Sequence, residues 1–253
     1  ESLGILAGGI AHDFNNLLTV MLGHAELIKA QMSPDSSLYD NVQRIIRSSH
    51  RAAGLCQQML AYAGKGKLVT KPCPLNTMLT DIREFLEVSV SKYVHLKYRP
   101  SSASPVIDGD ADQLHQVVIN LVTNASEAIG DQEGTVAIST GAMQCDEEYL
   151  RNTYVDDELP EGQYAYIEIA DNGSGMDEAD RQVLFDPFYT TKFLGRGLCL
   201  AAVLGIVRSH RGAITIDSEP KKGSTIRVLF PAIEWDDFTD EDKWNPEPSW
   251  HAS

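Results

Sequence analysis

A histidine with two polar neighbours near the start of the chain has the residue types and spacing of a nucleophilic site. His12 stands two residues after Ile10, a rotation of about 200° on a helix, so its imidazole points away from the apolar side. Such a ring attacks when one nitrogen is unprotonated and the other is held by an acceptor, which Asp13 can supply. Asn16 lies one turn on, where its amide can orient a water or a carboxylate. The alternative is a solvated polar helix face.

Two groups farther along the chain suit a divalent cation and a flat ring that carries an amine. Asn120 and Asn124 are four residues apart on one helical face, and amide oxygens are suitable ligands for Mg²⁺. Asp171 ends a predicted strand and can accept from an exocyclic amine, while Gly173 and Gly175 let the backbone close over the ring. The structural alternatives are surface asparagines and an Asx turn.

A glycine-containing segment before the last predicted helix has the chemistry of a phosphate site. Gly195 and Gly197 lead directly into a helix at Leu198, and the free N–H groups of a helix N-terminus favour phosphate. The segment lacks the preceding strand of a dinucleotide-binding fold and the Gly-Lys-Ser/Thr ending of a P-loop. Each of these groups is weak by itself, so their order along the chain decides the interpretation.

The first part of the chain is predicted to be a helical hairpin. Apolar residues recur at alternating spacings of four and three in two series, Leu3, Ala7, Ile10, Phe14, Leu17, Met21, His24 and Ile28, then Leu38, Val42, Ile45, Ser49, Ala52, Cys56, Met59 and Ala63. Residues 33–37 break the helix between them. Because one hairpin leaves much of this seam in water, we expect two chains to pair through residues 1–64 as a homodimeric four-helix bundle.

From about residue 70 the pattern becomes mixed α/β, typical of a sheet covered on one face by helices. We expect helices over residues 75–90, 111–129 and 198–210, and strands over 94–98, 135–143, 164–171, 213–218 and 224–230. The resulting organisation is a hairpin at 1–66, a linker or hinge at 67–74, an α/β domain at 75–231, and a tail at 232–253. That tail is acidic and holds all three tryptophans, either as a solvated linker or as a segment that docks on the body.

Composition excludes several classes of protein. The chain has 253 residues, 43% of them hydrophobic, and 36 acidic against 21 basic side chains give a net charge of −15, which argues against binding nucleic acid. No apolar run approaches the roughly 20 residues that span a bilayer, so we expect no direct membrane contact by this segment. Four widely spaced cysteines fit a reducing, cytoplasmic setting, and the start at Glu1 inside a helical pattern suggests a piece of a longer protein.

The ordered motifs resemble the sensor histidine kinases of two-component signalling, in the subgroup that reads His-Asp-Phe-Asn-Asn. The resemblance spans residues 1–231. Its motifs are AGGIAHDFNNLL at 7–18 (H box), QVVINLVTNA at 116–125 (N box), DNGSG at 171–175 (G1), FDPFYTTK at 185–192 (F box), GRGLCL at 195–200 (G2) and GST at 223–225. It implies an α+β architecture: a dimerisation and phosphotransfer hairpin, followed by an α/β-sandwich ATP-binding domain of the Bergerat type.

The resemblance also implies the roles of individual residues, with ATP and Mg²⁺ as cofactors. His12 would receive the γ-phosphoryl group, with Asp13 as proton acceptor, and the group would pass to an aspartate of a response regulator. Asn16 matches the position that orients water when such kinases dephosphorylate their partner. The implied nucleotide site comprises Asp171 on the adenine amine, Asn124 on Mg²⁺, Asn120 on the same face, Gly173 and Gly175 beside the base, Thr225 supporting adenine through water, and Lys192, Gly195, Gly197 and Leu198 in a mobile lid.

Two other functions stay open at this point. Cys199 stands where the family usually has glycine, and its side chain could crowd the lid, which would favour a weakened or non-enzymatic kinase-like scaffold. A hydrolysing ATPase of the gyrase class would need a carboxylate to activate water, and the corresponding position is Asn120. We therefore rank the kinase first, the scaffold second and the hydrolase third.

Overall fold

The computed structural model describes residues 18, 20–25, 27–29, 32, 36, 38–39, 41–43, 45–46, 49, 68–155, 158–185 and 199–233. The chain divides into two compact units, Glu1–Gly66 and Lys67–Ser253. Because the tail beyond Ile233 lies outside the described residues, its two interpretations stay open.

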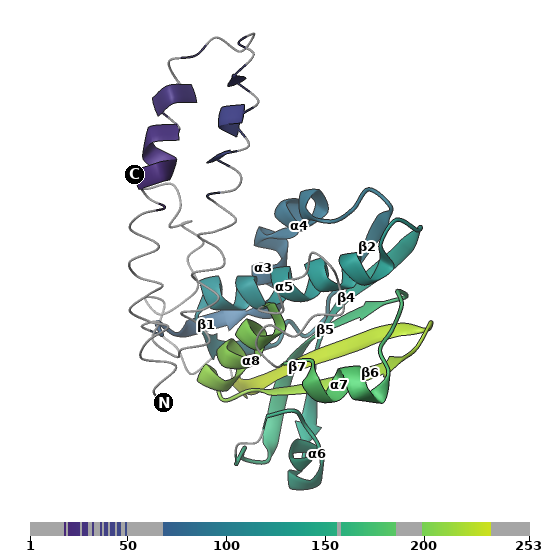
Figure 1. Ribbon diagram of the computed structural model, residues 1–253. Helices are drawn as coiled ribbons and strands as arrows, with labels where there is room; N and C mark the ends of the chain where they lie inside the picture. Colours follow the sequence, from purple (N-terminus) through teal and green to yellow (C-terminus); the bar gives the residue numbers. More distant parts are fainter. Residues whose placement is uncertain are drawn as a thin grey trace. The chain divides into compact units, whose positions relative to one another are not determined.

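The described part of the first unit is helical and folds back on itself, as the hairpin prediction requires (Figure 1). Ala25 from the first arm is buried with Val42 and Ile46 from the second, and Leu22 and Met32 pack against them. The two arms are therefore held together by apolar contacts, but of these five residues only Val42 belongs to the predicted seams.

Each arm also carries a second apolar side that a single chain leaves open. Met21 and Ile28 on the first arm are 54% and 51% exposed, and Leu38 and Ile45 on the second are 59% and 52% exposed. All four belong to the predicted seams. Part of each seam therefore faces outward from the single hairpin. His24, another predicted seam residue, is exposed as well.

A seven-stranded mixed sheet forms the second unit, with the strand order β1-β3-β7-β5-β4-β2 and β6 paired to β7. Only β2 and β4 run parallel to each other; the other pairs are antiparallel. The strands are β1 (Lys71–Pro74), β2 (Val94–Arg99), β3 (Val106–Gly109), β4 (Gly134–Cys145), β5 (Gly162–Asp171), β6 (Ala213–Glu219) and β7 (Gly223–Ile233).

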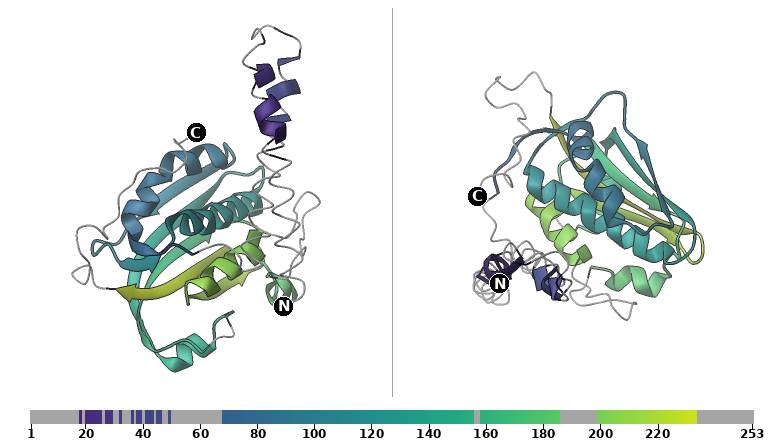
Figure 2. Two further views of the ribbon diagram at one scale, coloured as in Figure 1. Left: turned by 90° about the vertical axis from the view of Figure 1, so that its left-hand side faces the viewer. Right: turned by 90° about the horizontal axis from the view of Figure 1, so that it is seen from above.

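Helices α3 (Leu75–Asp81), α4 (Arg83–Ser89), α5 (Ala111–Ile129) and α8 (Cys199–Ser209) cover one face of this sheet (Figure 2). Alternate strand residues such as Ile138, Ile167 and Val228 are fully buried under them, as period-2 patterning requires. The short helix α6 (Glu147–Arg151) packs Leu150 on the opposite face, against Tyr164 and others. The remaining described helix, α7 (Glu178–Val183), follows the loop after β5.

The α/β-sandwich prediction is confirmed, with differences in detail. The helix predicted over 75–90 is two helices, because Ile82 leaves helical geometry with φ −99° and ψ 1°. Strands β1 and β3 and helices α6 and α7 were not predicted. They are four to six residues long, too short to show a period, and β3 exists because β1 and β7 pair with it. Among the described helices, none combines the length and apolar character that crossing a bilayer demands.

Candidate active site

Helix α5 carries both asparagines of the candidate cation site, and they have different surroundings. Asn120 is buried, accepts from Gln116 Nε2 at 2.7 Å and donates to the Cys199 carbonyl at 3.3 Å. Asn124, one turn later, is only half-buried. Asn120 therefore ties α5 to the start of α8, while the exposure of Asn124 leaves it better placed to meet a ligand.

The loop after β5 is packed onto the C-terminal end of α5. Asp171 closes β5 and accepts from the Gly173 N–H at 2.8 Å, and the Ser174 N–H donates to the Ala128 carbonyl at 3.0 Å. A side chain at Gly173 would meet that same Ala128 carbonyl. Since Ala128 is one turn after Asn124, the fold brings the predicted carboxylate loop and the predicted amide helix to one place.

Two further glycines fit this loop against the turn between β6 and β7. Gly175 has φ +62° and Gly223 has φ +95°, a region that favours glycine. A side chain at Gly175 would collide with the Glu219 backbone, and one at Gly223 with the carbonyl of Asp171. The glycine cradle, which we define as Gly173, Gly175 and Gly223, thus keeps the backbones tightly packed beside Asp171.

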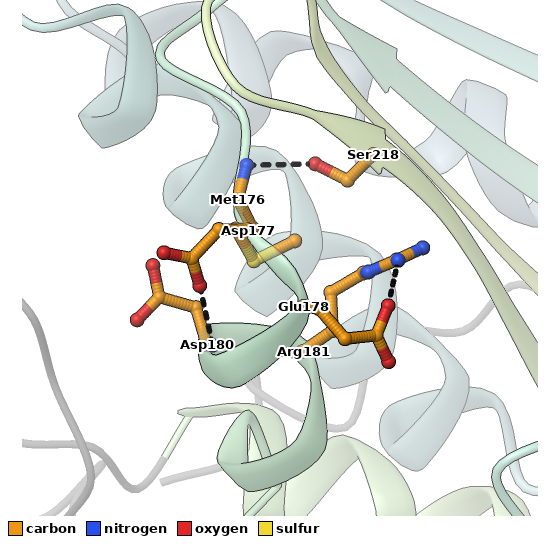
Figure 3. Close-up of polar contacts among 6 residues, drawn as sticks. All are labelled: Met176, Asp177, Glu178, Asp180, Arg181 and Ser218. Carbon is orange, nitrogen blue, oxygen red and sulfur yellow. Dashed lines mark hydrogen bonds and ion pairs between the residues drawn. The ribbon is translucent and has the colours of Figure 1, made fainter.

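A serine that the sequence analysis missed holds the far side of the loop. Ser218 Oγ accepts from the Met176 N–H at 2.9 Å, as Figure 3 shows. The next residue, Asp177, caps α7 by accepting from the Asp180 N–H at 2.9 Å. Arg181 pairs with Glu178 on the surface of that helix (Figure 3). The loop is therefore anchored to α5 at one end and to β6 at the other.

The strand register corrects the expectation for Thr225. Thr225 pairs directly with Ala170 on β5, and paired residues share a face, whereas Asp171 points to the other face. Ser224 points to the same face as Asp171, is buried, and its Oγ lies 2.9 Å from Ser218 Oγ. Alternation groups Ser224 with the buried apolar residues of β7 in the sequence, and the pairing with β5 places that group on the face of Asp171.

The remaining predicted site residues lie outside the described residues. They are His12, Asp13 and Asn16 in the first unit, and Lys192, Gly195, Gly197 and Leu198 in the segment before α8. Of the thirteen predicted residues, the structure brings together Asp171, Gly173, Gly175 and the helix that carries Asn120 and Asn124.

Comparison with known proteins identifies the two units separately. Residues 109–234 match the histidine kinase-, DNA gyrase B- and HSP90-like ATPase family, and residues 2–66 match the His Kinase A (phospho-acceptor) domain. The chain belongs to the sensor histidine kinases. It carries the domains of the kinase catalytic core, and the nucleotide-binding unit is of the ATPase family.

Known relatives of the kinase match about nine-tenths of its chain. It is 32% identical over 235 residues to sensor kinase CckA of Brucella abortus, covering 92% of this chain and 24% of the relative. It is 31% identical over 229 residues to sporulation kinase C of Bacillus subtilis (89% and 48%), and 28% over 234 to the histidine kinase/phosphatase NtrB of Azospirillum brasilense (92% and 57%). The chain thus spans between about a quarter and just over half of these relatives.

Solved structures show the same fold. The kinase superposes on full-length ShkA, determined in complex with AMPPNP, with a TM-score of 0.68 at 22% identity, covering 90% of this chain and 45% of that one. The nucleotide-free catalytic domain of histidine kinase ThkA gives 0.51 at 22% identity, covering 64% and 95%.

Proposed function

We propose that this kinase core transfers the γ-phosphoryl group of ATP to His12 and then passes it to an aspartate on the receiver domain of a response regulator. The observation that carries the proposal is the glycine cradle beside Asp171, placed at the end of the helix that bears Asn124. The match of residues 2–66 to a phospho-acceptor domain supports His12 as the acceptor.

The described residues fit an adenine nucleotide. Asp171 has a carboxylate at the end of β5 that can accept from the adenine amine, and any side chain at the cradle glycines would collide with the backbone of Ala128, Glu219 or Asp171 and displace the loop that carries it. Buried Ser224, rather than Thr225, lies on the face that would support the base through water. Lys192, Gly195, Gly197 and Leu198 are proposed to close over the phosphates, where the start of a helix favours anions.

Asn124 is proposed to hold Mg²⁺, because its amide oxygen is a suitable ligand and it lies one turn from the cradle. The ion would neutralise charge that develops on the phosphoryl group. Asn120 is proposed to shape this face from within, since both ends of its amide already contact protein groups.

The chain's own residues account for the transfer. A ring nitrogen of His12 attacks the γ-phosphorus as the bond to the bridging oxygen of the β-phosphate breaks, so that ADP leaves, and Asp13 accepts the ring proton. Of the predicted linker at 67–74, residues 71–74 form strand β1 of the sheet, so residues 67–70 are the proposed hinge that brings the two units together for this step. Asn16 is proposed to orient the water that hydrolyses the regulator's phospho-aspartate to aspartate and inorganic phosphate in a separate phosphatase reaction.

Dimerisation is proposed to cover the open apolar side of the hairpin. Met21, Ile28, Leu38 and Ile45 are each more than half exposed in one chain, and a second hairpin would bury them in a four-helix bundle.

The competing functions receive less support. A hydrolase of the gyrase class would need a carboxylate at position 120, where a buried asparagine contacts Gln116 and Cys199. The scaffold rests on Cys199 alone, whose backbone carbonyl accepts from Asn120.

The test is incubation of the chain with γ-labelled ATP and Mg²⁺. Wild type and His95→Gln, which changes an exposed histidine on β2, should take up acid-labile, base-stable label. His12→Gln should take up none while still binding nucleotide, and Asp171→Asn should bind nucleotide more weakly. Labelling of His12→Gln would reject His12 as the acceptor, and unchanged nucleotide binding by Asp171→Asn would reject the pocket.

A further inference from the structure

His210, which immediately follows α8, uses both ring nitrogens in contacts within the second unit. Its Nε2 accepts from the Asp110 N–H at 3.0 Å, so this nitrogen carries no proton. Nδ1 therefore carries the proton and donates to the Ile206 carbonyl at 2.9 Å. The ring is 7% exposed and packs edge-on against Phe230.

Asp110, the residue that His210 holds, connects two other parts of the fold. Its carboxylate Oδ1 caps α5 by accepting from the Gln113 N–H, and Oδ2 accepts from the Val69 N–H, both at 3.2 Å. Val69 lies in the proposed hinge, and the next residue, Thr70, donates to Asp108 at 3.1 Å. A chain of hydrogen bonds therefore runs from the end of α8 through the start of α5 to the hinge.

The same two helices are also tied at their other ends. Asn120 contacts Cys199 at the start of α8, and Ser209 at its end donates to Gln113 at 3.4 Å. Helix α8 thus lies antiparallel along α5. Because it follows the proposed lid segment directly, its position on α5 bears on both the nucleotide and the hinge.

We propose that neutral His210 is a positioning residue for the phosphotransfer proposed above, holding the hinge at Val69 and the end of α8 on the N-terminus of α5. It acts through Asp110, which places it among the groups that hold the fold in position. A proton on Nε2 would remove the acceptor of the Asp110 N–H and so loosen the residue whose carboxylate holds the Val69 N–H. The effect of His210 on phosphotransfer rests on the proposed function, whereas its effect on Asp110 and Val69 does not.

The surroundings favour the neutral ring. Burial lowers the pKa of His210 below its usual 6.5, against the opposing effects of the Ile206 contact and of the carboxylates of Asp110 and Asp108. The neutral ring thus contributes stability that is complete above the unfolded-state pKa and is lost as pH falls from there through the lower folded-state value.

The test compares wild type with His210→Gln, whose amide oxygen can still accept but does not titrate, with His210→Leu, which cannot accept, and with the exposed-site control His95→Gln. Amide exchange at Val69 and Asp110 is expressed as protection factors at pH 7.5 and 5.5. In wild type and His95→Gln these should be lower at pH 5.5, by at most about fivefold, the worth of one hydrogen bond. In His210→Gln they should not change, and in His210→Leu they should be low at both values.

The kinase readout is the ratio of autophosphorylation at pH 7.5 to that at pH 6.0. Any other pH dependence of the reaction is common to all variants, so a smaller ratio in His210→Gln than in His95→Gln reports His210 alone. A purely structural role would lower activity equally at both values. Protection factors of wild type that do not change with pH would overturn the proposal. Equal autophosphorylation ratios in His210→Gln and His95→Gln would also overturn it. Both outcomes can be measured even if His210→Leu fails to fold. Absence of labelling in wild type at pH 7.5 would reject the proposed function, while amide exchange would still decide the role of His210.

Discussion

Asn120 donates a hydrogen bond to the backbone carbonyl of Cys199 at 3.3 Å, across 79 residues of sequence. The contact joins the middle of α5 to the first residue of α8, which lies within the predicted G2 motif. It connects two motifs that the sequence presents as separate, and it assigns one of the two asparagines of the N box to the interior of the domain.

Replacing Asn120 by alanine should destabilise the second unit and weaken nucleotide binding. The change removes the donor to Cys199 and the acceptor of Gln116 Nε2 in a buried place, for an expected loss of about 1–3 kcal/mol in the free energy of unfolding. Urea unfolding and titration with a fluorescent ATP analogue would measure both effects. Unchanged stability would contradict the role assigned to Asn120.

Replacing Cys199 by glycine should leave autophosphorylation within about twofold of wild type. The Cys199 side chain is exposed, and a glycine keeps the carbonyl that Asn120 contacts. Initial rates of label incorporation at saturating ATP would test this. A severalfold increase would instead show that the cysteine impairs the lid and would favour the weakened-kinase alternative.

Replacing Ser218 by alanine should loosen the loop beside Asp171. The Met176 N–H loses its acceptor at 2.9 Å in a buried environment, which should cost about 1–3 kcal/mol of stability and lower nucleotide affinity. Thr215→Ala is the matched control, since Thr215 lies on the same strand with its side chain on the opposite face. Nucleotide titration that shows the same affinity in both variants would rule out this role for Ser218.

Replacing Tyr98 by phenylalanine should stabilise the domain. Within the described residues the buried Tyr98 hydroxyl has no hydrogen-bond partner, while its ring faces the Arg83 guanidinium at 4.6 Å, a contact that phenylalanine retains. Removing an unsatisfied buried group should raise the free energy of unfolding by about 1 kcal/mol. Tyr164→Phe should do the reverse, because its hydroxyl donates to Pro160 at 2.8 Å. The prediction fails if thermal unfolding shows equal losses for both.

Replacing Arg211 by glycine should also stabilise the domain. Arg211 has φ +52°, a left-handed conformation at the end of α8 that costs a residue with a side chain about 1 kcal/mol, and glycine adopts it without that cost. Arg208→Gly, inside the helix, should lose about 1 kcal/mol. Shifts of the urea unfolding midpoint in opposite directions from wild type would distinguish the two positions. A loss of stability in Arg211→Gly would contradict the expected gain.

Much of the architecture could be predicted from short-range patterns. The 19-residue helix α5 was predicted with its observed bounds, because a long apolar repeat and a capping aspartate are local properties. The central strands were predicted to within a few residues. The shorter β1, β3, α6 and α7 were not, because only their neighbours in space stabilise them.

The sequence by itself determined the family and the order of the motifs, since both are carried by residue types at fixed spacing. Only the tertiary structure decided that Ser224 rather than Thr225 lies on the face of Asp171, that Asn120 holds α8, and that His210 reaches Asp110 from 100 residues away. The physical reason is that a strand register and a hydrogen bond between distant segments depend on how the whole sheet and its helices pack. No local pattern encodes that packing.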